Sequence, residues 1–391
     1  MEAILVIANL LIVGNGFDLK CGLRSTYRNF FESRISADVK ENIIDLSERL
    51  IFDTNHNSIY FYEYEKYKKE SVGMPSSSYS LIKDANLTFW DLLFLLYFGE
   101  DIEKDWHDVE NNILDILIRF DFSYDHSSLG RLEEYKHFLL SGDLSAESKF
   151  KEKLRICCIL AYFVLEPERY NTFRSMEEFL QSELRIFEKA FNTFLWDLID
   201  THGDYNTNAQ ILLHQIIGMS STVEDYTVIS FNYTGPRCFQ GKLTNVHGSL
   251  KKWNIIFGVD QNEIEATSPI FKFTKTYRKL IQLKADTTNL IFFENKDELK
   301  NIYFYGHSLS PLDYSYFQSI FDSYNLYESK VSLIFCCSKY GNKSSEQILS
   351  EHADLVGRLL EKYGTTMNNK NHGKNLVHKL MLEGRLTIKE I

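Results

Sequence analysis

The sequence predicts an α/β fold in which a mostly parallel, open sheet carries a large helical insertion. The opening run, Ile4 to Val13, is continuously apolar and ends at a glycine, as is typical of a strand buried on both faces of a parallel sheet. Residues from Phe89 to about Ile199 then show helical periodicity, and short apolar runs return only after them. A first strand, a long helical stretch and a final alternation of strands and helices together indicate this architecture.

The elements are predicted in order along the chain. The first helix begins at Ser25 or Thr26, because a hydroxyl there can cap it and aromatic residues follow at helical spacing. The later strands lie at four apolar runs: Tyr226 to Phe231, Ile255 to Val259, Ile302 to Tyr305 and Val331 to Phe335. The basic last segment, 369–391, ends in strand-like residues, Arg385 to Ile388, to which the pattern assigns no neighbour.

With 391 residues and no internal repeat, we expect one large unit with an insertion rather than a string of separate domains. The sheet core consists of residues 1–45 and 222–340. Residues 46–221 form a mainly helical insertion, and residues 341–391 form a C-terminal extension of helix and strand.

Charge and composition exclude several classes of protein. The chain carries 43 Lys and Arg against 54 Asp and Glu, a net charge of −11, which argues against binding of bulk nucleic acid. The longest strongly apolar helix, Phe89 to Phe98, is too short to span a membrane, so we expect no membrane partner.

The six cysteines point to a reducing compartment. Two adjacent pairs (Cys157-Cys158 and Cys336-Cys337) and two single residues (Cys21 and Cys238) give no C-x-x-C spacing. We therefore expect no metal site, small buried cysteines on a helix and a strand, and a cytoplasmic location.

A glycine-rich turn follows the first predicted strand: Gly14-Asn15-Gly16-Phe17-Asp18-Leu19. Small residues between a buried strand and a helix let backbone N–H groups approach a phosphate. However, Leu19 stands where a dinucleotide fingerprint has its third Gly, and Asp18 disfavours an anion. The alternative is a tight turn that binds no ligand.

Two single polar residues stand out further along the chain. Asn232, directly after Tyr226 to Phe231, has an amide that can donate to and accept from a sugar hydroxyl or a water, or can simply end the strand in an Asx-turn. His247, in Val246-His247-Gly248, titrates near neutral pH and can act as a general base, or can be an ordinary surface or hydrogen-bonded histidine.

The segment Gly306 to Asp313 directly follows a predicted strand and has two interpretations. In the first it is a nucleophile elbow with Ser308 as the nucleophile, although Ser310 stands where the second Gly is required; its base would be His352, His372 or His378. In the second, which we favour, Gly306 and Ser308 shape a ligand-binding turn and Asp313 lies at the start of the next helix.

Taken in chain order, these motifs resemble the AbiH family of bacterial proteins of phage abortive infection. The resemblance is carried by Ile12-Val13-Gly14-Asn15-Gly16-Phe17-Asp18-Leu19, Gly22-Leu23, Tyr27, Phe30, Trp106, Glu110, Ser230 to Thr234, Val246-His247-Gly248, Phe257-Gly258-Val259-Asp260 and Tyr305 to Leu309 with Asp313. It runs from about residue 11 to about residue 317 and is loose in the central helices. Arg24 and Asn29 stand where the family pattern has Pro and Asp.

The same order of parts remotely resembles the sirtuin-type NAD-binding fold, a Rossmann-like sheet. This resemblance implies that Asn232 orients the nicotinamide ribose or an attacking water and that His247 is the general base. It implies a cofactor site lined by Gly14, Asn15, Gly16, Asp18, Gly306, His307, Ser308 and Asp313. Sirtuin deacylases also carry a four-cysteine zinc module, whose spacing this sequence lacks, so hydrolysis of NAD to nicotinamide and ADP-ribose is implied rather than deacylation.

The expected function is therefore that of a defence effector that consumes NAD as its substrate. Its expected partners are NAD or a related nucleotide and a phage-encoded trigger, and a homo-oligomer is compatible with the sequence. Two alternatives stay open: a protein that senses a nucleotide without turning it over while its insertion binds another protein, and a serine hydrolase.

Overall fold

The computed structural model describes residues 9–56, 76–98, 106–119, 157, 161, 176–218, 226–239, 243–261, 264–282 and 299–391. The chain divides into two compact units. Unit 1 consists of Met1–Ser25, Asn192–Ala266 and Thr274–Ile391, and unit 2 consists of Thr26–Phe191 and Thr267–Phe273. Among the described helices, none combines the length and the apolar character that a membrane crossing requires.

Unit 1 is built on a six-stranded sheet whose described strands all pair in parallel. The strands are β1 (Asn9–Val13), β2 (Tyr226–Ser230), β3 (Leu243–Asn245), β4 (Asn301–Tyr305), β5 (Ser332–Cys337) and β6 (Leu386–Glu390). Their order, β3-β2-β1-β4-β5-β6, confirms the predicted α/β, Rossmann-like fold. In this order β1 is central, and the direction in which the chain adds strands reverses between β1 and β4.

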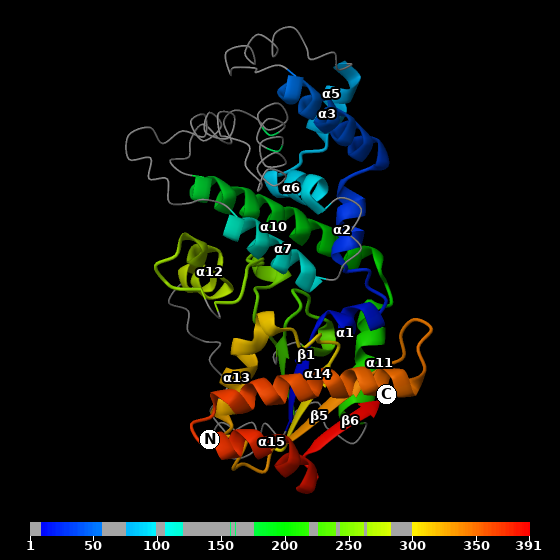
Figure 1. Cartoon of the computed structure of the whole chain (residues 1–391). Coiled ribbons are helices and arrows are strands. Elements are labelled where there is room, and N and C mark those ends of the chain that lie inside the picture. Colours follow the sequence, from blue (N-terminus) through cyan, green and yellow to red (C-terminus); the bar gives the residue numbers. More distant parts are fainter. Residues whose placement is uncertain are drawn as a thin grey trace. The chain divides into compact units, whose positions relative to one another are not determined.

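In the part of unit 1 that the structure describes, six α-helices and several 3-10 helices accompany this sheet. They include α1 (Asn15–Lys20), α11 (Tyr205–Ile217), α12 (Lys275–Gln282), α13 (Tyr314–Ser323), α14 (Ser345–Thr366), α15 (Lys370–Leu382), η3 (Arg237–Phe239), η4 (Leu250–Lys252) and η8 (Pro311–Asp313). A capping box starts α14: Ser344 Oγ accepts the Gln347 N–H at 3.2 Å, and Gln347 Oε1 accepts the Ser344 N–H at 2.9 Å. Figure 1 shows α14 running across the strands on the side of β5 and β6.

The two faces of β1 belong to two different hydrophobic cores. Leu10 and Ile12 pack in one core with residues of α13, α14 and α15. Leu11 and Val13 pack in the other core with residues of α1 and α11. Because helices cover both faces of the sheet, the strand is apolar at successive positions instead of alternating with polar residues.

Unit 2 is helical, as the periodicity of the sequence predicts. It contains α2 (Tyr27–Arg34), α3 (Ala37–His56), α5 (Ser76–Asp84), α6 (Phe89–Phe98), α7 (Trp106–Arg119), η5 (Pro269–Phe273) and the first part of α10 (Met176–Thr201). Thr26 caps α2 as expected, accepting the Asn29 N–H at 3.2 Å. Aromatic rings form much of the core: the Phe30 ring lies 5.4 Å from that of Phe187 and 5.1 Å from that of Phe191, both edge to face.

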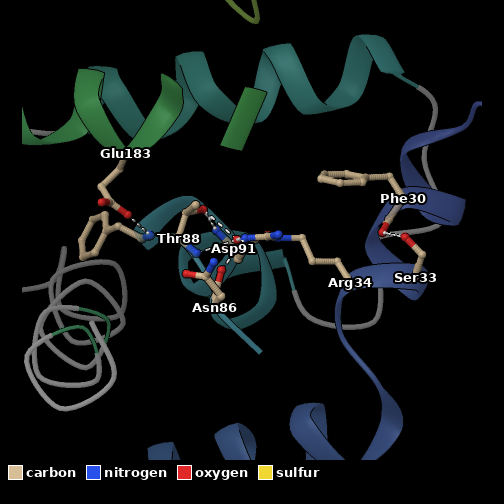
Figure 2. Close-up of polar contacts among 8 residues, drawn as sticks. Phe30, Ser33, Arg34, Asn86, Thr88, Asp91 and Glu183 are labelled. Atoms are coloured by element: carbon tan, nitrogen blue, oxygen red, sulfur yellow. Dashed lines mark hydrogen bonds and ion pairs between the residues drawn. The ribbon is translucent and has the colours of Figure 1, made fainter. Parts of the chain in front are cut away.

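A buried polar cluster joins three helices of unit 2 (Figure 2). Asp91 of α6 is fully buried, accepts the N–H and the hydroxyl of Thr88 at 2.7 Å each, and receives Arg34 Nε of α2 at 2.9 Å on both oxygens. Glu183 of α10 accepts the Phe89 N–H at 2.8 Å. Two carboxylates therefore accept the amides of Thr88 and Phe89 at the N-terminus of α6, where the helix dipole favours negative charge.

The strand predicted at Ile255 to Val259 is wrong: this run is buried but irregular, with one isolated bridge from Val259 to Thr274. Its polar backbone groups are satisfied without a neighbouring strand. Arg278 donates to the Phe257 carbonyl, Lys275 N–H donates to the Val259 carbonyl at 2.9 Å, and Ile256 N–H donates to the His247 carbonyl at 2.9 Å. The sheet position instead belongs to β3, which the sequence did not reveal.

The two units have different limits from the domains predicted on the sequence. Residues 26–45 lie in unit 2, because Tyr27 and Phe30 pack with aromatic residues of α6 and α10. Residues 192–221 lie in unit 1, where α11 packs on β1 and β4. The extension 341–391 also lies in unit 1, because β6 pairs with β5.

Candidate functional site

The predicted site residues follow the carboxyl ends of neighbouring parallel strands. Gly14 follows β1, Asn232 follows β2, His247 follows β3 and Gly306 follows β4. Val13 is level with both Ser230 and Tyr305 in the sheet, so these strands end at one edge. In open α/β sheets, ligands bind at this edge, at the point where the strand order reverses.

The two glycine turns pack backbone against backbone at this edge. Gly14 N–H donates to the Tyr305 carbonyl at 3.0 Å, and Gly16 N–H donates to the Gly306 carbonyl at 2.8 Å. A Cβ atom at Gly14 would lie 2.6 Å from His307 Cα, and one at Gly306, whose φ is +67°, would collide with the Phe17 amide. Glycine is therefore required by this close contact, and the Gly14 and Gly16 amides are bonded within the chain.

Asp18 lies at the centre of a first cluster, the Asp18 cluster, with Tyr205, Thr234 and Asn232. Its Oδ1 accepts the Tyr205 hydroxyl at 2.8 Å, and its Oδ2 accepts the Thr234 hydroxyl at 2.7 Å. Burial raises the pKa of Asp18 to about 6, and these hydrogen bonds partly oppose the rise. Asn232 Nδ2 donates to the Gly14 carbonyl at 3.0 Å. Asp18 and Asn232 thus hold the turns after β1 and β2 in place.

Asp313 lies at the centre of a second cluster, the Asp313 cluster, with Lys275, His247 and His307. Its Oδ1 is 2.8 Å from Lys275 Nζ and 3.2 Å from His247 Nε2, and its Oδ2 is 3.4 Å from His307 Nε2. Burial raises the pKa of Asp313, but the Lys275 charge and the two histidines outweigh burial and hold this pKa well below its ordinary value. The carboxylate is therefore ionised and can orient the histidine rings.

His247 is a buried imidazole held in one orientation. The rings of Phe231 and Tyr316 approach it edge to face, each with its centroid 5.4 Å away. Burial and the nearby Lys275 charge lower the pKa of His247 to about 4 against the opposing effect of Asp313, so the ring is neutral at pH 7. The Asp313 carboxylate, 3.2 Å from Nε2, favours the tautomer with the proton on Nε2 and the lone pair on Nδ1.

His307 is fixed in the matching tautomer. Its Nδ1 accepts the Leu309 N–H at 2.8 Å, which leaves the proton on the Nε2 that faces Asp313. Phe231 lies against this ring too, with 4.3 Å between centroids. Of the two histidines, His247 therefore keeps a ring nitrogen that can take a proton from water or a hydroxyl, with Asp313 in the orienting role.

Helix α12 contributes the part of the site that sequence reasoning missed. Lys275, Arg278 and Lys279 lie at positions i, i+3 and i+4 and share one face of the helix. Lys275 binds Asp313, Arg278 binds the Phe257 carbonyl and Lys279 Nζ donates to the Val246 carbonyl at 2.6 Å. The spacing of the three cations is the one signal in the sequence, but it equally describes a solvated helix face.

The remaining predicted residues lie outside both clusters. Asn15 Oδ1 accepts the Ser25 hydroxyl at 2.7 Å. Ser308 is exposed, while two of the three histidines considered as its base make contacts of their own: His352 Nδ1 lies 3.1 Å from the Ile348 carbonyl, and His372 stacks on the Tyr327 ring. Across the described ranges, no three His, Cys, Asp or Glu side chains are arranged to hold a metal ion.

Comparison with known proteins adds one match. Residues 10–335 match the family described as "Bacteriophage abortive infection AbiH", and this range contains every member of the Asp18 and Asp313 clusters. No curated protein and no solved structure matches the chain significantly.

Proposed function

This chain belongs to the AbiH family of bacteriophage abortive-infection proteins, and we propose that it is a defence effector that hydrolyses NAD to nicotinamide and ADP-ribose. One observation carries this proposal. A neutral, buried histidine is paired with an ionised aspartate, 3.2 Å apart, at the sheet edge where open α/β sheets of this strand order bind dinucleotides.

In this proposal the dinucleotide lies along the edge formed by the turns after β1, β2 and β4. The bond from Asn232 Nδ2 to the Gly14 carbonyl fixes the amide, so its Oδ1 is the atom that meets the ribose or an attacking water. The exposed Ser308 and the N-terminal residues of α1 line the same edge. The proposal also includes that NAD lies in this site in the arrangement of the sirtuin-type fold.

Cleavage of the nicotinamide–ribose bond needs orientation and a base rather than a strong nucleophile, since nicotinamide is a good leaving group. Nicotinamide departs with the electron pair of the broken C–N bond, and the water oxygen bonds to the ribose carbon. The water proton passes to His247 Nδ1 and then to solvent. Asp313 stabilises the imidazolium that forms. The negative diphosphate of the bound substrate raises the pKa of His247 from its low value toward neutral pH.

The test is an assay of nicotinamide release from NAD by the purified protein, with and without extract of phage-infected cells. We expect release by the wild type and a loss of about 100-fold or more in His247→Ala and in Asn232→Ala. The matched control is His352→Gln, which changes a histidine on α14. Equal toxicity of the wild type and the His247→Ala, Asn232→Ala double variant in cells would overturn the proposal.

A second candidate, a protein that binds a nucleotide without turning it over, is favoured by one observation. With a pKa of about 4, His247 is a weak base in the ligand-free protein. Stoichiometric binding of NAD by calorimetry, without any product even when infected-cell extract is added, would establish this candidate in place of the first.

A further inference from the structure

Asp260 is a buried carboxylate with one unsatisfied oxygen. The residue is 8% exposed, and its Oδ1 accepts the Ser315 hydroxyl at 3.1 Å. Its Oδ2 is buried and has no hydrogen-bond partner among the residues that the structure describes. Leaving a buried acceptor unpaired costs free energy, and the cost is larger when the acceptor belongs to a charged group. A bound partner for this oxygen is therefore expected.

Two short connections tie Asp260 to the Asp313 cluster. The first runs through Val259, the preceding residue, whose carbonyl accepts the Lys275 N–H at 2.9 Å, while the side chain of the same lysine reaches Asp313 at 2.8 Å. The second runs through Ser315, in the first turn of α13, which begins directly after Asp313. Asp260 therefore adjoins the Asp313 cluster through the backbone of Lys275 and through the first turn of α13.

The charge of this group restricts what the free oxygen can bind. The free oxygen belongs to an acidic side chain, so a phosphate in direct contact with it is repelled by like charge, and the nearby cations of Arg278 and Lys279 are already held by the Phe257 and Val246 carbonyls. Lys275 already pairs with Asp313, and no metal-binding group of side chains is found in the described ranges. A neutral hydrogen-bond donor on a ligand satisfies the oxygen without adding like charge.

We propose that Asp260 binds the substrate, its Oδ2 accepting a hydrogen bond from a sugar hydroxyl of the nucleotide. This inference rests on the proposed function, because it takes the nucleotide to occupy the sheet edge beside His247. It places a neutral ribose at Asp260 and the diphosphate away from it. Asp260 thus serves as a specificity residue that distinguishes ribose from deoxyribose.

Calorimetric titrations of NAD, ADP-ribose and their 2′-deoxy and 3′-deoxy analogues test this role. The wild type is expected to bind one of the deoxy analogues about 10- to 100-fold more weakly than the parent nucleotide. Asp260→Asn keeps an oxygen for Ser315 but replaces the free acceptor. This variant is expected to bind NAD and ADP-ribose more weakly than the wild type does, by the same factor of about 10 to 100. It is expected to bind that deoxy analogue no worse than the wild type does.

ADP-ribose lacks the nicotinamide carboxamide, which is the other neutral donor of NAD. If Asp260→Asn weakens NAD but leaves ADP-ribose unchanged, the partner is the carboxamide and the proposal is wrong. The control Asp322→Asn removes a carboxylate on α13 that accepts the Tyr363 hydroxyl, and it is expected to bind every ligand as the wild type does.

The thermal midpoint of the ligand-free protein separates binding from structure. Asp260→Asn is expected to leave this midpoint unchanged or to raise it, because the unpaired charge is gone. A lowered midpoint together with unchanged discrimination between ribose and deoxyribose would assign Asp260 to structure alone. Wild type that binds parent and deoxy nucleotides equally would overturn the inference but not the hydrolase, whereas wild type that binds no NAD would overturn both.

Discussion

Nε2 of His247 lies 3.2 Å from Oδ1 of Asp313, although the two residues follow different strands, β3 and β4. The pair forms because parallel strands end at one edge of the sheet, and because Lys275 and the aromatic rings fix both partners.

Asp313→Asn should lower the rate of NAD hydrolysis by about 100- to 10,000-fold, because an amide no longer enforces the His247 tautomer or stabilises its charged form. It should also cost about 3 to 5 kcal/mol of stability, since Lys275 is left buried without its partner. The double variant Asp313→Asn, Lys275→Met should recover part of the stability but none of the activity. Full activity in the single variant, measured as nicotinamide release, would contradict the assigned role.

Lys275→Met should raise the pKa of His247 above its present value of about 4. The lysine charge is one cause of the low value, and Asp313 acts in the opposite direction. The measurement is a proton NMR titration of the His247 ring, with Lys339→Met as a control for loss of an exposed charge. An unchanged or lower His247 pKa would show that the lysine does not act on the ring.

Two buried groups should give opposite dependences of stability on pH. His247 has a pKa lowered from 6.5 to about 4, so its contribution is present above pH 6.5 and is lost as pH falls toward 4. Asp18 has a pKa raised from 3.8 to about 6, so its contribution is present below pH 3.8 and is lost as pH rises through 6. Each amounts to about 3 kcal/mol.

The two variants should therefore respond to acid in opposite ways. Between pH 7 and pH 4, Asp18→Asn should lose stability more steeply than the wild type, and His247→Gln should lose it less steeply. Urea midpoints at several pH values measure both slopes. Parallel slopes in all three proteins would refute the pKa values.

Gly306→Ala should cost about 2 to 5 kcal/mol, because it adds a Cβ at positive φ and against the backbone of the neighbouring turn. Two other glycines separate these effects. Gly341→Ala, also at positive φ but with open space around it, should cost about 1 to 2 kcal/mol. Gly357→Ala, inside α14 with open space, should add up to about 1 kcal/mol of stability. Thermal midpoints that change by the same amount in all three variants would contradict this prediction.

Arg34→Met should destabilise unit 2 by about 3 to 5 kcal/mol, because the fully buried Asp91 carboxyl group would lose its cation. Arg28→Met breaks an exposed ion pair with Glu32 on the same helix and should cost less than about 1 kcal/mol. Amide hydrogen exchange in α6 reports the difference. Similar exchange rates in the two variants would show that the Arg34–Asp91 pair stabilises unit 2 no more than the exposed Arg28–Glu32 pair does.

Much of the fold could be predicted because its strands carry strong local patterns. Mostly apolar runs at β1, β2, β4 and β5 and the aromatic spacing of α2 each indicate the element that forms. β3 could not be found, since its three residues are half-buried and owe their conformation to pairing with β2. The run at Ile255 to Val259 has the pattern of a strand, yet basic side chains and a loop, not a strand, satisfy its backbone.

The site was predictable in its positions and less so in its contacts. Asn232 and Asp313 stood out because polar residues that follow buried strands meet at one sheet edge, whereas His247 was singled out by the family resemblance. The sequence could not show that Asp18 holds Tyr205 and Thr234, because those contacts span most of the chain. Nothing local marks Lys275 as buried, since a lysine at the start of a helix is ordinarily in solvent.

The central place of β1 also sets the time at which this protein can fold. β1 pairs with β2 and β4, and its Asn9 bonds to Asn301, 292 positions further along the chain. At ordinary rates of translation, ribosomes need roughly 15 to 60 s to add that much chain. Until that point β1 cannot have β2 and β4 paired on its two sides, and pairing between such distant segments is intrinsically slow. A chain whose synthesis is interrupted before β4 lacks Asp313 and therefore cannot assemble the histidine–aspartate pair.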